Sequence, residues 1–227
     1  MITMIRNLLL KLTLIQISIC LIIQSIHART DLSGPHPLLL KKIESTGGLV
    51  ALWKFTEKPG KKRMASGLGK FPLNESGGRI PRISEGPLSG YSIALDGSSW
   101  LSLPNSQTGP LNISGEKGEV TVIAWIKWTG EQTGFVGGMW NEYQDGGKRQ
   151  YGLFISLPHY NGKDQVCGHI SRTGKPTPPF PYSIDYSASA QKVPAGEWCC
   201  VAFTYDGRFI RSYLNGIFEP RDPELIN

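Results

Sequence analysis

The stretch WCCVAFTYDGRFIRSYLNG at residues 198–216 decides the fold class. Asp206-Gly207 and Asn215-Gly216 are two-residue turn signals, because Gly, Asn and Asp tolerate the positive φ that tight hairpin turns require. The residues between the turns alternate like those of a strand with one buried side, with Ile210 and Leu214 on one face and Arg211 and Tyr213 on the other. Two β-hairpins in series predict an antiparallel sheet.

Other segments of the chain show the same strand character. In Glu119–Trp128 every second residue is apolar, and Val120, Val122, Ala124, Ile126 and Trp128 share one face. Further strands are predicted at Leu49–Phe55, Phe135–Trp140, Gln150–Leu157 and Gln165–Ser171, and a strand pair at Tyr91–Leu95 and Ser99–Leu103 around Asp96-Gly97. A long surface loop is predicted over Glu57–Pro87, and a short helix begins near Leu38. Regularly spaced short strands predict an all-β sandwich or barrel.

The composition agrees with a globular protein rich in turns. Hydrophobic residues make up 40% of the 227 residues, and the chain has 27 Gly and 16 Pro. The net charge of +6 is spread along the chain, and the tight basic run Lys61-Lys62-Arg63 has no aromatic neighbours to stack on bases. We therefore expect a solvated surface there and no nucleic-acid partner.

The N-terminus has the pattern of a signal peptide. Arg6 and Lys11 precede an apolar run from Leu12 to Ile23, and Ala28 suits the position before a cleavage site. We expect a signal peptide over 1–28, a lead-in over 29–46 and one domain over 47–227. The protein would then be exported and secreted, periplasmic or at the cell surface, with membrane contact only through an uncleaved signal.

Three cysteines remain after removal of such a signal: Cys167, Cys199 and Cys200. Adjacent Cys199 and Cys200 point to opposite faces of their strand, so at most one of them can face Cys167. One disulfide to Cys167 and three small buried thiols are both open at this point.

The ordered segments resemble the laminin-G-like, concanavalin A-like lectin/glucanase domains, in the form found in exported bacterial proteins. The segments that carry the resemblance are GLVALWKF, YSIALDGSSWLSLP, VTVIAWIKW, GFVGGMW, YGLFISL and the double hairpin above, from Gly48 to Phe218. The resemblance implies an antiparallel jelly-roll β-sandwich, one sheet of which forms a concave ligand surface. Such domains carry further strands after the double hairpin, so we expect the last strands to lie beyond Asn227 or in another chain.

The resemblance also raises the question of catalysis. Retaining glucanases of this kind need two carboxylates about 5 to 5.5 Å apart, on one strand face. Glu142 and Asp145 are three residues apart before a Gly-rich turn, a spacing that places strand residues on opposite faces. We therefore expect a noncatalytic protein, with a glycan-cleaving enzyme and a structural or adhesive cell-surface protein as the alternatives.

A glycan is the ligand that the sequence favours. Sugars pack their C–H faces on aromatic rings, and polar side chains bind their hydroxyl groups. The candidate ligand-binding residues are Trp140, Tyr143, Tyr151, His159, Tyr160 and His169. Many laminin-G-like domains bind calcium, and the acids available for a calcium site here are Glu142, Asp145 and Asp164.

Overall fold

The computed structural model describes residues 34–115, 118–141, 148–158, 162–175 and 186–219. They belong to two compact units, one ending at Thr108 and the other beginning at Gly109. All strand pairs among these residues are antiparallel. None of the helices in the described part of the chain has the length and apolarity that a membrane crossing requires.

The first unit is built from short elements. The predicted helix is present as α2 (Pro37–Glu44), with a proline at its N-terminus and basic residues in its last turn. The strands are β1 (Ala51–Trp53), β2 (Ala65–Gly67), β3 (Asn74–Ser76), β4 (Arg82–Ile83), β5 (Ser92–Ile93) and β6 (Trp100–Ser102). They form three two-stranded sheets, β1–β2, β3–β6 and β4–β5, and a 3-10 turn, η1, follows at Asn105–Gln107.

Two predictions for this unit were wrong. Glu57–Pro87 contains three short strands, and the two segments around Asp96-Gly97 do not pair with each other, because β5 pairs with β4 and β6 with β3. The turn itself is a local structure: Asp96 Oδ1 accepts hydrogen bonds from the backbone and the hydroxyl groups of Ser98 and Ser99.

A buried ion pair organises the segment that was predicted as a loop. Arg63 is fully buried, and its Nη2 lies 2.6 Å from Glu75 Oε1 and 3.1 Å from the carbonyl oxygen of Ile80. The Glu75 carboxylate also accepts hydrogen bonds from the backbone N–H groups of Gly60 and Ile80. Because both charges have several partners, the pair fixes the turn before Arg63 against β3 and the residues that follow it.

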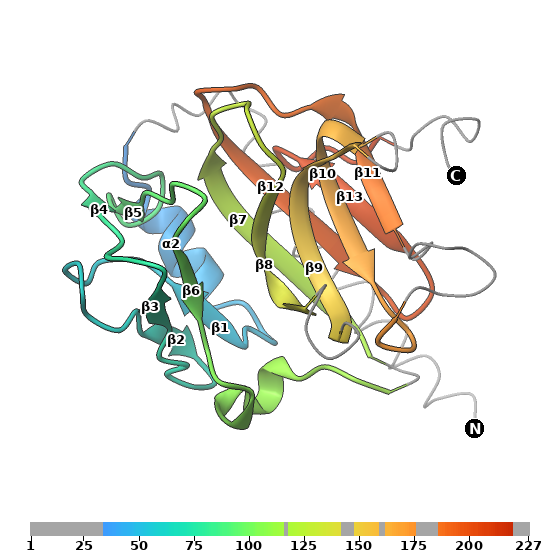
Figure 1. Ribbon diagram of the computed structural model, residues 1–227, viewed down its shortest axis with the longest axis horizontal. Coiled ribbons are helices and arrows are strands. Elements are labelled where there is room, and N and C mark those ends of the chain that lie inside the picture. The colour runs from blue at the N-terminus through green and yellow to red at the C-terminus, as the bar shows by residue number, and fades with distance from the viewer. Residues whose placement is uncertain (1–33, 116–117, 142–147, 159–161, 176–185, 220–227) are drawn as a thin grey trace. The chain divides into compact units, whose positions relative to one another are not determined.

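The second unit is a two-layer β structure (Figure 1). After a 3-10 turn, η2 (Gly109–Leu111), come β7 (Val120–Lys127), β8 (Gly134–Asn141), β9 (Lys148–Leu157), β10 (Gly162–Ile170), β11 (Tyr186–Lys192), β12 (Trp198–Tyr205) and β13 (Ile210–Leu214). One sheet has the order β11-β10-β9-β8, and the other has the order β13-β12-β7. The predicted double hairpin supplies β12 and β13, and β12 pairs with β7 along its whole length.

The core lies between these two sheets. Leu153, Ile155 and Val166 of the four-stranded sheet pack with Val201 and Phe203 of the three-stranded sheet, all of them essentially inaccessible to solvent. The four β7 residues predicted to share a face, together with Trp128 directly after the strand, all contact this core, as do Ile210 and Leu214 of β13. The all-β fold with antiparallel sheets is thereby confirmed.

Buried hydroxyl groups add to the contact between the layers. Ser212 Oγ on β13 lies 2.6 Å from Ser187 Oγ on β11, and it accepts a hydrogen bond from the N–H of Gly168 on β10. Gly168 leaves room for Phe203 of the facing sheet, because a Cβ on this residue would lie 2.6 Å from the Cβ of Phe203.

Candidate functional site

Two of the predicted ligand-binding residues meet on the outer face of the four-stranded sheet, the face turned away from the core. Trp140 is the penultimate residue of β8 and His169 that of β10, and their ring centroids are 5.3 Å apart. Phe154 of β9 lies 5.4 Å from Trp140 and 5.5 Å from His169. Tyr186 of β11 completes the group, 4.7 Å from His169. Together with Phe135 of β8, these residues form what we call the outer aromatic cluster.

Two glycines allow the rings to lie close to the sheet. Gly138 and Gly152 face each other across β8 and β9. A Cβ on Gly152 would lie 2.6 Å from the ring of Phe154, and one on Gly138 would collide with the carbonyl oxygen of Tyr151. Because neither glycine has a side chain, the Phe154 ring packs directly on the backbone of the sheet at this point.

Phe135 is the exposed member of the cluster, and Trp140 and Tyr186 are half-buried. The Phe135 side chain is 48% exposed, whereas Phe154 is 9% and His169 4% exposed. The Phe135 and Phe154 rings are 5.1 Å apart, so the exposed ring is supported by the buried one. An aromatic ring held in one place on a sheet face can take the apolar face of a flat ligand at little cost in conformational entropy.

Arg149 gives the cluster a positive charge. Its guanidinium carbon lies 5.6 Å from the centroid of the Trp140 ring, within the range of a cation–π contact. Burial, together with the charge of Arg149, lowers the pKa of His169 to about 3. His169 is therefore neutral at physiological pH, and Arg149 is the cation of this group.

Tyr151 lies elsewhere. In β9 it shares the inner face with Leu153 and Ile155, and it is 6% exposed. Its hydroxyl group donates a hydrogen bond of 2.8 Å to the carbonyl oxygen of Leu111, and burial raises its pKa to about 12. Tyr151 thus belongs to the core and does not reach the outer aromatic cluster. The other three candidates, Tyr143, His159 and Tyr160, lie outside the described residues.

The candidate calcium ligands do not form a described cluster. Asp164 is in β10, and its Oδ2 lies 3.3 Å from Nζ of Lys192. Glu142 and Asp145 lie outside the described residues. Among the residues with described positions, no group of three or more His, Cys, Asp or Glu side chains is placed to hold a metal ion.

The three cysteines are buried and form no disulfide within the described residues. Cys167 lies on the outer face of its sheet, where its Sγ is 3.4 Å from the Tyr186 hydroxyl, and it packs with Phe154. Cys199 faces the core between the sheets, and Cys200 faces the opposite side of β12. Burial raises the pKa of Cys200 to about 12, with a further contribution from Cys199.

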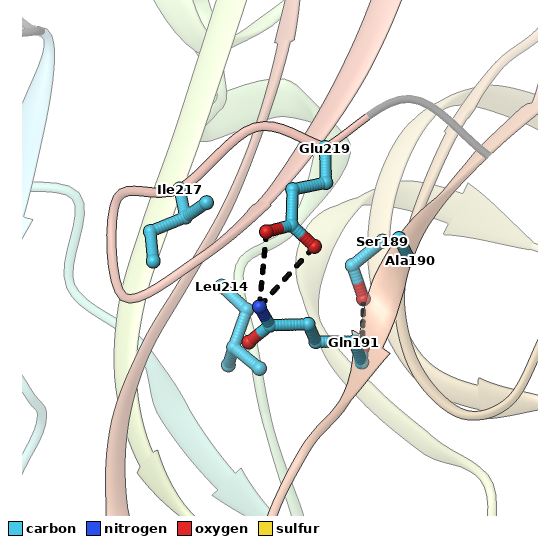
Figure 2. Close-up of a pocket in the computed structure, with 6 residues that line it drawn as sticks. All are labelled: Ser189, Ala190, Gln191, Leu214, Ile217 and Glu219. Carbon is cyan, nitrogen blue, oxygen red and sulfur yellow. Dashed lines mark hydrogen bonds between the residues drawn. The ribbon is translucent and has the colours of Figure 1, made fainter.

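A hollow beside the ends of β11 and β13 is lined by side chains that bind one another (Figure 2). Nε2 of Gln191 donates hydrogen bonds of 3.1 and 3.2 Å to the two carboxylate oxygens of Glu219. Ser189 turns its hydroxyl group to the carbonyl oxygen of Gln191. Because these polar groups satisfy one another, the hollow offers little to a ligand.

Comparison with known proteins adds no assignment: no protein-family model, no curated protein and no solved structure matches the chain. The outer aromatic cluster is therefore the feature on which a function can be argued. Four of its contributors were not singled out from the sequence, namely Phe135, Arg149, Phe154 and Tyr186. Strand alternation identifies Phe135 and Phe154 as outer-face residues once Val136, Leu153 and Ile155 are assigned to the core.

Proposed function

We propose that this protein is an exported, noncatalytic module that binds a glycan on the outer aromatic cluster. The observation that carries the proposal is the exposed ring of Phe135, which packs on Phe154, on a sheet face that also carries Trp140 and the Arg149 guanidinium group. A sugar ring would lay its C–H face on Phe135 or on the accessible part of Trp140. The guanidinium group of Arg149 beside the Trp140 ring would give the site a polar, charged edge.

The fold proposal is a jelly-roll sandwich of the concanavalin A-like, laminin-G-like kind. Two antiparallel sheets with a common apolar core support it, and so does the order of segments from Gly48 to Phe218. Fold alone does not determine the ligand, so the glycan assignment depends on the outer aromatic cluster. Calcium at Glu142, Asp145 and Asp164 stays a prediction, and so does export through the segment 1–28.

The described residues give less support to the alternative function, that of a glycan-cleaving enzyme. The carboxylates of Glu75, Asp206 and Asp164 pair with Arg63, Arg211 and Lys192. The Glu219 carboxylate accepts hydrogen bonds from Gln191. Each of these acids has a structural role within its own strand or turn, which leaves it a poor acid or nucleophile for cleaving a glycosidic bond.

The test is a glycan array with the whole protein, run with calcium and with a chelator, followed by titration of the best saccharide. Phe135→Ala should weaken binding roughly tenfold, since a stacked ring contributes on the order of 1 kcal/mol or more. Phe209→Ala is the matched control, because Phe209 is 49% exposed in the same unit but lies on the β12–β13 turn. Equal affinity of the two variants for a bound saccharide would rule out this site.

A further inference from the structure

The basic run at residues 61–63 consists, in the folded protein, of one buried arginine and two exposed lysines. Arg63 is fully buried and paired with Glu75, so it cannot meet a partner. Lys61 and Lys62 are exposed, and Lys58 is exposed on the same turn, where its carbonyl oxygen accepts a hydrogen bond from the N–H of Lys61.

Arg79 brings a fourth cation to this turn. It is exposed, and its Nη2 lies 3.5 Å from the carbonyl oxygen of Pro59. None of Lys58, Lys61, Lys62 and Arg79 forms an ion pair with an acid at the described positions. Glu57 is the acid of the turn, and its Oε1 accepts a hydrogen bond of 2.9 Å from the N–H of Met64. Four cations around one acid make this turn electropositive.

The turn is also held in one conformation. Nη1 of Arg63 donates hydrogen bonds to the carbonyl oxygens of Glu57 and Lys58, and Glu75 accepts hydrogen bonds from the N–H of Gly60. The buried pair therefore fixes the backbone on both sides of Pro59. A charged surface on a fixed backbone loses little entropy when it meets a partner.

We propose that this turn, with Arg79, is a docking surface for an anionic lipid membrane. Lysines attract a charged surface without needing a particular geometry, each contributing about 1 kcal/mol near anionic lipid. Met64 directly follows the buried arginine and is 39% exposed, which gives the basic surface an apolar side chain that suits the boundary between headgroups and acyl chains. No aromatic side chain lies in the run 57–64 for nucleic-acid bases to stack on.

The test is vesicle co-sedimentation of the whole protein. Vesicles of phosphatidylcholine alone are compared with vesicles that contain phosphatidylglycerol, at low and at high salt. The measured quantity is the ratio of the two affinities, compared between each variant and the unchanged protein, so that any binding through residues 1–28, which all of them share, cancels. Lys61→Gln with Lys62→Gln should lower this ratio roughly 25-fold, since two charges are removed.

Lys41→Gln with Lys42→Gln is the matched control, because these two lysines are also adjacent and exposed and lie in α2 of the same unit. It should change the ratio less than about twofold if the turn carries the binding. Met64→Ser should weaken binding severalfold at both salt concentrations. Equal losses in the two double variants would overturn the proposal, and so would binding to dextran sulfate or duplex DNA without binding to anionic vesicles. Because the glycan site lies in the other unit, neither result bears on it.

Discussion

Replacing Gly168 by alanine tests how closely the two sheets of the second unit pack. The added Cβ would lie 2.6 Å from the Cβ and 2.8 Å from the Cγ of Phe203, a side chain with no exposed surface. Carbon atoms in contact are normally about 3.5 to 4.0 Å apart, so β10 and β12 must separate by roughly 1 Å. The nearest atom is a Cβ, which cannot turn away by a change of rotamer. Overpacking of this kind costs about 1 to 3 kcal/mol.

The assay is thermal and denaturant unfolding of the whole protein, followed by tryptophan fluorescence. For a unit of this size, the predicted loss lowers Tm by roughly 5 to 20 °C. Gly137→Ala is the control, because Gly137 is in β8 of the same sheet and a Cβ there meets nothing within 4 Å. This control should leave stability unchanged or raise it by up to about 1 kcal/mol. If Gly168→Ala is as stable as the Gly137→Ala control, the sheets do not meet as described.

Three further predictions concern buried groups. Burial and, secondarily, Arg149 lower the pKa of His169 to about 3, so the folded state resists protonation there. Stability should fall as pH drops from about 6.5 towards 3, by up to about 1.4 kcal/mol per pH unit, and His169→Phe should remove that slope in acid unfolding curves. Arg63→Met should lower the free energy of unfolding in urea by about 3 to 5 kcal/mol because it leaves the Glu75 carboxylate without its charge partner. Adding Glu75→Gln to the same variant should recover part of this loss. The thiol of Cys200, with its pKa raised to about 12, should not react with a disulfide reagent at pH 8 until denaturant is added, and rapid labelling of the native protein would contradict its burial.

The parts of the fold that the sequence predicts well are those set by local patterns. Alternation in β7 and the two turn signals around β13 identified the core faces correctly, because period and turn chemistry are properties of adjacent residues. β11 was not predicted, since Tyr186–Lys192 contains no aliphatic run. This strand is held by backbone pairing and by hydroxyl groups, such as the Ser189 Oγ that accepts a hydrogen bond from the N–H of Val166.

Long-range pairing could not be predicted from single segments. β3 pairs with β6 although the paired residues, from Ser76 with Trp100 to Asn74 with Ser102, are 24 to 28 positions apart in the chain, and a buried Arg63–Glu75 pair supports this part of the chain. A charged residue in a Pro- and Gly-rich segment normally indicates a surface loop. That such a residue is buried becomes evident only when its ion-pair partner in the folded structure is known.

The candidate site was predicted in part. Trp140 and His169 stand out in the sequence as aromatic residues near strand ends, and strand pairing brings their rings together. Tyr151 stands out for the same reason, but it is two and four positions from Leu153 and Ile155, so it shares their face of β9 and lies in the core. The close approach of Phe154 to the sheet depends on Gly152, whose partner Gly138 is on another strand, so this arrangement requires the register between β8 and β9.

The most direct test of glycan binding at the outer aromatic cluster is amide hydrogen exchange with and without a saturating saccharide from the array. We expect slower exchange in peptides from β8 and β9, which carry Phe135, Trp140 and Arg149, and no change in the β12–β13 turn around Phe209. Binding that protects the turn or the first unit, while β8 and β9 exchange as before, would contradict glycan binding at this cluster.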